Sequence, residues 1–243
     1  MNNKITILIP ARMESTRFPG KPLAPINGIP MIVYCARNAL ETGLDVYVCT
    51  DSKEVESVCS LYNVSSILTP KFNTGTDRIA YAAENLKTDY VINLQGDEPL
   101  INSQSLKILI NKLENLNKNS KEIISGISYI NSQEAFDPNI VKCALIKKNL
   151  SIQYFSRKPL LNFPDGEEIN SYIKQLGLYA MTKETLKEFA TLTQGDLEKA
   201  ERVELLRWLE YGNKIRGCVI DQKTISVDTP QDLVDALEVI YSR

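Results

Sequence analysis

Short apolar runs alternate with helix-like stretches through the first part of the chain. The apolar runs contain β-branched residues, as is typical of buried strands in a parallel sheet; they lie at 4–9, 45–50, 64–68 and 90–94. The helix-like stretches lie between them, at 30–42, 51–60 and 75–86. Asp51 is the expected N-cap of the second stretch. This order predicts right-handed βαβ units and an α/β fold, with a mostly parallel central sheet flanked by helices.

After Asn102 the pattern changes to shorter strands, loops and helices. Strands are predicted at 122–130, 141–147, 151–155, 177–181, 214–220 and 224–227, with the second and third paired. Helices are predicted at 103–117, 182–191, 197–211 and 229–242, and a polar loop at 160–172. The helix at 197–211 is amphipathic, and its core candidates are Leu197, Ala200, Val203, Leu206 and Trp208. Pro230 lies in the first turn of the last helix, where its missing N–H is not needed.

Ligands of parallel sheets bind beyond the carboxyl ends of the strands, which directs attention to the segment 10–23. Arg12, Arg17 and Lys21 supply positive charge there, and Gly20 permits close approach of the backbone. A triphosphate carries about four negative charges and needs such cations and N–H donors. The segment is neither a GxxxxGK[ST] loop nor a GxGxxG turn, and its composition also fits a solvated basic loop.

Two aspartates stand where strands are predicted to end. Asp97 follows the strand at 90–94, and Asp228 precedes the last helix. Mg²⁺ prefers one or two carboxylates together with water and substrate phosphates, so both are candidate ligands. Each could instead merely cap a helix. A Thr74-Gly75 turn with Arg78 could offer backbone donors and a guanidinium to a base or phosphate, or be an ordinary helix start.

The composition excludes several classes of protein. The 243 residues include 28 basic and 30 acidic ones, for a net charge of −2, which argues against a nucleic-acid or membrane-surface binder. There is no histidine, so an imidazole base is excluded. The five scattered cysteines indicate buried thiols in a reducing compartment. No secretory signal and no run of roughly 20 apolar residues is present, and we expect a cytoplasmic protein.

Several segments, taken in order, resemble the cytidylyltransferases that make the CMP derivative of 3-deoxy-manno-octulosonate (KDO). The resembling segments are IPARMESTRFPGKPL, NTGTDR, NLQGDEP, AFDPNIVK, YFSRKPL, LGLYA, LEKAERVELLRWLEYG and VDTPQDL. The resemblance implies a Rossmann-like nucleotidyltransferase fold in a single domain, residues 1–243. Residues 1–118 would form its CTP-binding half, and residues 119–243 a smaller, β-rich half for sugar binding and dimerisation.

The resemblance also implies roles for individual residues. Arg12, Lys21 and Asp97 would be catalytic, and Asp97 and Asp228 would bind Mg²⁺. The CTP-binding set would be Pro10, Ala11, Arg12, Ser15, Arg17, Lys21, Thr74, Gly75, Arg78 and Gln95. The sugar-binding set would be Arg157, Gln175, Glu204 and Leu205. The reaction implied is attack of the sugar's anomeric hydroxyl on the α-phosphorus of CTP, with release of pyrophosphate, for lipopolysaccharide synthesis.

The chain departs from the family pattern at two positions expected to line the sugar pocket. Gln175 stands where the family usually has histidine, and Leu205 where it usually has glutamine. Leucine cannot form hydrogen bonds through its side chain. Either these changes are neutral, or the sugar is altered away from its anomeric centre, as in 8-amino-3,8-dideoxy-manno-octulosonate. Glu198, Glu201 and Glu204 would then be partners for the ammonium group, or else part of a solvated helix face.

Other classes of function fit less well. A cytidylyltransferase for nine-carbon sialic-type acids is a second alternative. A nucleotide sensor would not need both aspartates, and an NAD-dependent oxidoreductase would need a GxGxxG turn. The resemblance further implies a homodimer, with the 197–208 helix and residues 120–180 as candidate interfaces. The expected partners are CTP and an acidic 3-deoxy sugar, without nucleic acid or membrane.

Overall fold

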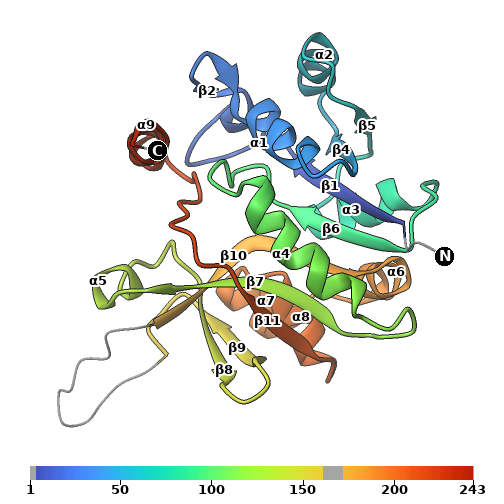
Figure 1. Ribbon diagram of the computed structural model, residues 1–243, viewed down its shortest axis with the longest axis vertical. Helices are drawn as coiled ribbons and strands as arrows, with labels where there is room; N and C mark the ends of the chain where they lie inside the picture. The colour runs from blue at the N-terminus through green and yellow to red at the C-terminus, as the bar shows by residue number, and fades with distance from the viewer. Residues whose placement is uncertain (1–3, 161–171, 243) are drawn as a thin grey trace.

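The computed structural model describes residues 4–160 and 172–242 (Figure 1). One mixed sheet of nine strands forms the centre of this part of the chain. In spatial order the strands are β5 (Ser66–Leu68), β4 (Asp45–Thr50), β1 (Ile5–Ala11), β6 (Tyr90–Leu94), β10 (Tyr172–Thr182), β7 (Ile123–Ile130), β11 (Ile215–Val219), β9 (Ser151–Ser156) and β8 (Lys142–Ile146). Most of the polar loop predicted at 160–172 lies outside the described residues.

The direction of the strands divides the sheet into two parts. β5, β4, β1 and β6 are parallel to one another, which confirms the βαβ units expected at the start of the chain. β10 lies antiparallel between β6 and β7, and β8 and β9 pair as an antiparallel hairpin. β11 runs parallel to β7. The sheet is therefore parallel in its first part and mixed beyond β6.

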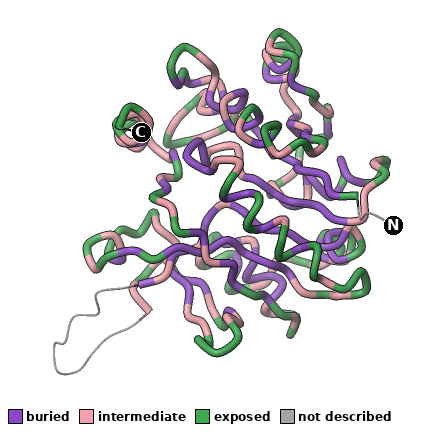
Figure 2. Tube along the Cα trace, in the orientation of Figure 1, coloured by how far each residue is buried: buried purple, intermediate pink, exposed green. Residues whose placement is uncertain are grey.

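Helices cover both faces of the sheet (Figure 1). On one face, α1 (Met31–Leu40), α2 (Lys53–Leu61) and α4 (Ser103–Glu114) share one core cluster with the odd-numbered residues of β1. On the other face, α3 (Gly75–Ala83), α6 (Lys183–Thr191) and α8 (Leu205–Glu210) belong to the cluster that contains Leu8. All seven residues of β1 are buried, as a strand covered on both sides must be, and Figure 2 shows buried residues concentrated along the central strands.

The remaining elements are small or lie at the edge. A 3-10 helix, η1 (Lys21–Leu23), leads into a short hairpin of β2 (Pro25–Ile26) and β3 (Ile29–Pro30). This hairpin and α5 (Ser132–Ala135) were not predicted. The last helix, α9 (Pro230–Tyr241), packs through Ala236 against the hairpin and α1. None of the helices in residues 4–160 and 172–242 combines the length and apolarity that a membrane span requires.

The helix predicted at 197–211 is two helices. α7 (Asp196–Glu201) ends at Arg202, whose φ of 54° lies in the left-handed region, and α8 starts three residues later. The break changes the face that each part turns to the core. Leu197 and Ala200 are exposed and Glu198 is buried in α7, so the first two core candidates were wrong, whereas Val203, Leu206 and Trp208 are buried.

Two smaller expectations were also wrong. The 224–227 segment is not a strand; it is an irregular segment in which Thr224 O accepts from Lys174 Nζ and Val227 N donates to Asp97 O. The N-cap of α2 is Ser52, whose hydroxyl accepts from Val55 N. Asp51 instead pairs with Arg78 at 2.9 Å.

The prediction of buried thiols is confirmed. Cys35, Cys49, Cys59, Cys143 and Cys218 are all free and buried. Burial raises the pKa of the Cys49 and Cys143 thiols to about 12 and that of Cys59 to about 11. These cysteines therefore act as small apolar residues of the core.

Candidate active site

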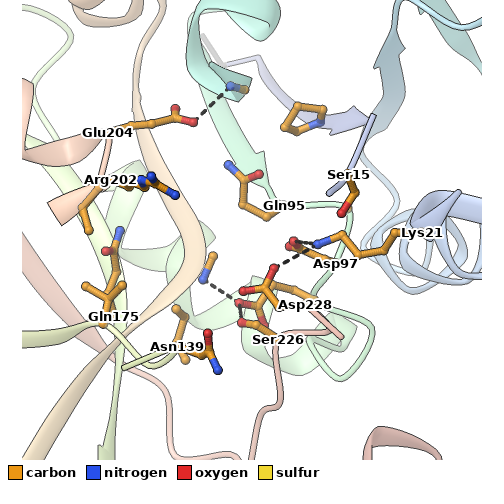
Figure 3. A pocket seen from close by; sticks show the side chains of 18 of the residues that line it. Ser15, Lys21, Gln95, Asp97, Asn139, Gln175, Arg202, Glu204, Ser226 and Asp228 are labelled. Carbon is orange, nitrogen blue, oxygen red and sulfur yellow. Dashed lines mark hydrogen bonds and ion pairs between the residues drawn. The ribbon is translucent and has the colours of Figure 1, made fainter. Parts of the chain in front are cut away.

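A cavity of about 1550 Å³ lies beyond the carboxyl ends of β1 and β6, where the predicted ligand segments meet. Its lining comes from parts of the chain far apart in sequence, within 10–32, 72–78, 95–98, 134–141, 157, 174–179, 200–205 and 224–235. All the sequence-predicted site residues line it. Figure 3 shows how the acidic, basic and amide side chains of these segments face one another across the cavity.

The segment 10–23, which we call the phosphate loop, forms one wall. Ser15 Oγ accepts a hydrogen bond from Phe18 N at 3.2 Å. Gly20, the residue before η1, has φ of 70°, a conformation that glycine adopts without strain. Arg12 is exposed, and no hydrogen bond or ion pair joins its guanidinium to the described residues. The loop therefore brings an uncommitted cation to the cavity.

The two predicted metal ligands, Asp97 and Asp228, converge. Lys21 Nζ lies 2.6 Å from Asp97 Oδ2 and 3.2 Å from Asp228 Oδ1 (Figure 3). Arg17 Nη2 lies 3.0 Å from Asp228 Oδ2. Burial lowers the pKa of Lys21, but the two carboxylates outweigh it, and the pKa lies above its usual value.

Neither aspartate serves as a helix cap, which was the alternative interpretation. The cap of α4 is Asn102. α9 is capped by Thr229 and Asp232, and the carboxylate of Asp232 also accepts from the backbone N–H of Asp228. The carboxylates of Asp97 and Asp228 are thus left to face the cavity.

This pair of carboxylates fits Mg²⁺. Two acidic side chains already share one cation, and oxygen is the donor that Mg²⁺ prefers. In residues 4–160 and 172–242, no three acidic or cysteine side chains gather into a metal site. A bound ion would therefore take its other ligands from water and from phosphate oxygens, as Mg²⁺ sites in nucleotide enzymes do.

Glu98 is a site residue that the sequence did not single out. Its side chain is buried, and Oε1 accepts from Gly177 N at 2.9 Å and from the Ser226 hydroxyl. Burial, followed by the negative charge of Asp97, raises its pKa. Oε2 has no hydrogen-bond partner among the described residues. A Cβ at Gly177 would lie 2.7 Å from Oε1, so the glycine is what lets this carboxyl cross beneath β10.

Pro10, Gly75 and Gln95 pack closely together on the cavity wall and form the candidate base site, which we call the base slot. A Cβ built on Gly75 would lie 3.1 Å from Pro10 Cγ and 3.4 Å from Gln95 Nε2. Thr74 caps α3 through a bond from Asp77 N. Gln95 Nε2 lies 3.4 Å from both Asn93 Oδ1 and the Tyr179 hydroxyl. The slot therefore offers amide and backbone groups beside an apolar ring.

Arg78 lines the cavity, but its guanidinium is bonded to other residues of the protein. Its guanidinium is buried, with Nη2 at 2.9 Å from Asp51 Oδ2 and Nη1 at 2.7 Å from Thr69 Oγ1. Most of its donors are therefore engaged under the cavity wall. Arg78 supports the segment 69–78 rather than presenting a free guanidinium to a base.

Replacing Gly75 with alanine should weaken nucleotide binding without weakening the fold. The methyl group would lie 3.1 Å from Pro10 Cγ and 3.4 Å from Gln95 Nε2, contacts that a shift of these side chains can relieve, and alanine is a better helix former than glycine. We expect the KM for the nucleotide to rise by about tenfold, on the order of 1.4 kcal/mol, with an unchanged or raised Tm. A lowered Tm with an unchanged KM would contradict this interpretation of the slot.

On the opposite wall, Glu204 binds the start of α3. Its carboxylate accepts from Gly75 N at 3.0 Å, from Thr76 N at 2.9 Å and from the Thr76 hydroxyl. An acidic group is favoured at this end of a helix. Glu204 therefore joins the second half of the chain to the base slot.

The other two glutamates of this region are also engaged. Glu198 forms a bidentate ion pair with Arg207, and Glu201 accepts from Arg157 N at 2.8 Å and the Ser156 hydroxyl at 3.1 Å. The interpretation of Glu198, Glu201 and Glu204 as a solvated helix face was therefore wrong. None of the three carboxylates is without a partner.

The predicted sugar-binding residues differ in what they can offer. Gln175 is half-buried and lines the cavity. Leu205 borders the cavity too, but its side chain is 0% exposed and packs in the core, so it has no accessible surface for a ligand. Arg157 Nε donates to Glu201 O, and Nη1 donates to Pro138 O. These bonds use much of the hydrogen-bonding capacity of its guanidinium.

Arg202 is a second residue that the sequence did not reveal. Its side chain is exposed, lines the cavity and lies between Glu204 and Gln175 (Figure 3). No side-chain hydrogen bond or ion pair holds it to any described residue. Its position depends on the left-handed backbone that ends α7, and that conformation at an arginine leaves no mark in the residue pattern.

Known proteins match this chain over nearly its whole length. A family model described as Cytidylyltransferase matches residues 6–215. The 3-deoxy-manno-octulosonate cytidylyltransferase of Wolinella succinogenes is 39% identical over 241 residues, 96% of this chain and 98% of the relative. The 8-amino-3,8-dideoxy-manno-octulosonate cytidylyltransferase of Shewanella baltica is 40% identical over 237 residues, 94% of this chain and 95% of the relative.

A solved structure gives the same result for the fold. It is of CMP:2-keto-3-deoxy-manno-octonic acid synthetase complexed with CTP, and it matches with a TM-score of 0.89 and 32% identity over 99% of both chains. The fold match and the family model point to the same family. The chain therefore belongs to the cytidylyltransferase family.

Proposed function

We propose that this enzyme transfers the cytidylyl group of CTP to an acidic 3-deoxy sugar, with KDO as the first candidate and its 8-amino relative as the alternative. The observation that carries the proposal is the arrangement in one cavity of a cationic phosphate loop, a carboxylate pair and a base slot. Relatives named for both sugars resemble the chain equally well, at 39% and 40% identity.

The nucleotide would lie along the wall formed by the phosphate loop. The base would lie on the wall beside Gly75, where Gln95 provides hydrogen-bonding groups. Arg12 and Lys21 face the phosphates and neutralise charge as pyrophosphate leaves, which is the main contribution of protein groups in such transfers. Asp97 and Asp228 would hold Mg²⁺, which would supply further neutralisation of the phosphate oxygens.

The sugar acid would bind between this wall and β10. In the reaction, its anomeric hydroxyl oxygen bonds to the α-phosphorus, and the bond from that phosphorus to the β-phosphate oxygen breaks. Positioning provides much of the rate enhancement in such a step. The sugar carboxylate suits a guanidinium, and Arg202 and the remaining capacity of Arg157 are the candidates on this side of the cavity.

Two features of the cavity bear on the choice between KDO and its 8-amino relative. Glu198, Glu201 and Glu204, the carboxylates expected to meet an ammonium group of the sugar, are already engaged with other residues of the protein. Because Leu205 has no accessible surface, its difference from the family pattern does not remove a polar wall group. Both points favour KDO, and Gln175 remains the one unusual residue that can reach a sugar.

Leu205→Gln should therefore change stability rather than sugar preference. Glutamine would place an amide in the hydrophobic core, at a cost of about 1–3 kcal/mol in the free energy of unfolding. We expect the ratio of kcat/KM for KDO to that for the amino sugar to stay the same. Urea denaturation and a two-substrate assay measure the two effects, and a shifted ratio with unchanged stability would show that residue 205 contacts the sugar.

The proposed function is tested by following pyrophosphate release from CTP with Mg²⁺ and one sugar acid at a time. The panel is KDO, 8-amino-3,8-dideoxy-manno-octulosonate and a nine-carbon sialic acid. We expect the fastest turnover with KDO. Faster turnover with the amino sugar would establish the alternative, and turnover only with the sialic acid would place the chain in another branch of the family. If none of the three sugar acids leads to pyrophosphate release, the proposal is contradicted.

We also infer the setting in which the enzyme works. Residues 1–118 would bind CTP, and residues 119–243 would bind the sugar and form a homodimer. A product that carries KDO would serve lipopolysaccharide synthesis in the cytoplasm. Light scattering at micromolar concentration tests the dimer, and a monomer there would contradict it.

A further inference from the structure

The carboxylate pair of the cavity is bonded to cations that belong to the protein itself. Lys21 Nζ lies within 3.2 Å of both Asp97 and Asp228, and the side chains of the three residues are 15%, 28% and 22% exposed, respectively. Ion pairs in such partly buried places are screened less by salt than surface pairs are. The ammonium group therefore contributes to neutralising the negative charge of the two carboxylates.

Lys21 occupies the position that a metal ion bound by this pair would take. The lysine contacts Asp97 Oδ2 and Asp228 Oδ1, one oxygen of each carboxylate. An ion bridging the two side chains would compete for these oxygens, and two positive charges in the same place would repel each other. Metal and lysine therefore exclude each other from the space between the aspartates.

When a nucleotide is bound, its phosphate oxygens offer the lysine an alternative partner. Its ammonium group is carried on a flexible four-carbon stem, and residue 21 belongs to the phosphate loop, where anionic oxygens are proposed to lie. A phosphate would replace the carboxylates as its partner, so the charge of the lysine stays neutralised after it leaves the pair. Nucleotide binding thus opens the space that the ion needs.

We propose that Lys21 is an internal counter-ion of the metal site: it occupies the carboxylate pair in the free enzyme and moves to the phosphates when nucleotide binds, so that the divalent ion binds with or after the nucleotide. This inference rests on the metal site of the proposed function. It makes Lys21 a residue that sets the order of binding, in addition to its contact with the phosphates.

Arg17 strengthens the same arrangement at Asp228. Its Nη2 lies 3.0 Å from Asp228 Oδ2, and its Nη1 donates to Asn139 Oδ1 at 2.9 Å. Asn139 belongs to the loop between α5 and β8, so the phosphate loop is tied to the second half of the chain. The side chain of Arg17 is 48% exposed, and its contribution is smaller than that of Lys21.

The test measures the affinity of the full-length protein for Mn²⁺, by isothermal titration or by the paramagnetic resonance of the free ion. Each protein is titrated alone and with a non-hydrolysable CTP analogue, with correction for ion bound by the analogue itself. The variants are Lys21→Met and Lys21→Gln. The matched control is Lys71→Met, since Lys71 pairs with Glu14 of the same loop at 2.7 Å but on the exposed surface.

We expect wild type and Lys71→Met to bind Mn²⁺ weakly alone and more tightly with the analogue. Removing the charge of Lys21 should raise the affinity for the ion alone by about tenfold or more and reduce the gain that the analogue gives. Adding Asp97→Asn to Lys21→Met should abolish the raised affinity, which assigns it to the carboxylate pair.

Two outcomes would overturn the proposal. One is a Lys21 variant that folds, by circular dichroism, and binds the ion no more tightly than wild type. The other needs no variant: wild type that binds Mn²⁺ as tightly alone as with the analogue. Failure of the proposed function gives a different result, because a protein that releases no pyrophosphate with any sugar can still show the exchange at Asp97 and Asp228.

Discussion

Asp97→Asn is expected to lower kcat by two to three orders of magnitude, the largest effect of any single change proposed for this enzyme. Loss of one group that stabilises developing charge in a transition state typically costs about 10²–10³ in rate. Asparagine keeps the shape of the side chain but removes the negative charge that faces Lys21 at 2.6 Å. The metal site would then keep one of its two carboxylates.

Pyrophosphate release at saturating CTP and sugar measures the effect. The matched control is Asp45→Asn, because Asp45 forms an exposed ion pair with Lys4 outside the cavity and should leave kcat unchanged. The Tm of Asp97→Asn should be close to that of wild type, since Lys21 retains Asp228 as a partner. A kcat within about threefold of wild type would show that Asp97 does not contribute to the charge stabilisation proposed here.

Arg207→Met should lower the free energy of unfolding by about 3–5 kcal/mol, as expected when one partner of a buried ion pair is removed. Arg207 is 2% exposed; its Nε and Nη2 donate to the two carboxylate oxygens of Glu198 at 2.7 and 2.8 Å. Nη1 also bonds to Asp77 at 2.9 Å, and the guanidinium lies 4.7 Å from the centre of the Phe189 ring. Methionine would leave the buried carboxylate of Glu198 without a cationic partner, although its hydrogen bond from Gln194 Nε2 at 3.0 Å would remain.

Urea denaturation of three variants separates this effect from simple loss of packing. Lys187→Met removes an exposed ion pair with Glu184 and should change stability by less than about 0.5 kcal/mol. The double variant Glu198→Met/Arg207→Met removes both buried charges, and it should recover much of the loss, because apolar replacement of a whole buried pair is often neutral. A double variant less stable than Arg207→Met would show that packing, rather than the uncompensated charge, dominates.

The sequence predicted the first, parallel part of the sheet well. Continuous apolar runs with β-branched residues gave the four parallel strands, and the rule that ligands bind beyond strand ends located both the phosphate loop and Asp97. These features depend on local pattern and on the direction of parallel strands. Both can be read without knowing the contacts between distant residues.

The second half was harder because its structure depends on distant contacts. Nothing local marks β10 as the antiparallel strand between β6 and β7. The break at Arg202 has no glycine, and the burial of Glu198 depends on Arg207 and on the packing of α3. Glu98 lies next to Asp97 in sequence, but its burial beneath Gly177 appears only once β10 is in place.

The five buried cysteines make the natural sequence a convenient starting point for site-specific labelling. A thiol reacts as its thiolate, and burial holds the pKa of Cys49 and Cys143 near 12, while Cys35 is fully enclosed. A maleimide dye added near neutral pH should therefore modify a newly introduced surface cysteine and spare the native ones. Fluorophores placed on the two walls of the cavity could then measure the distance between the walls in solution, without first removing any cysteine from the core.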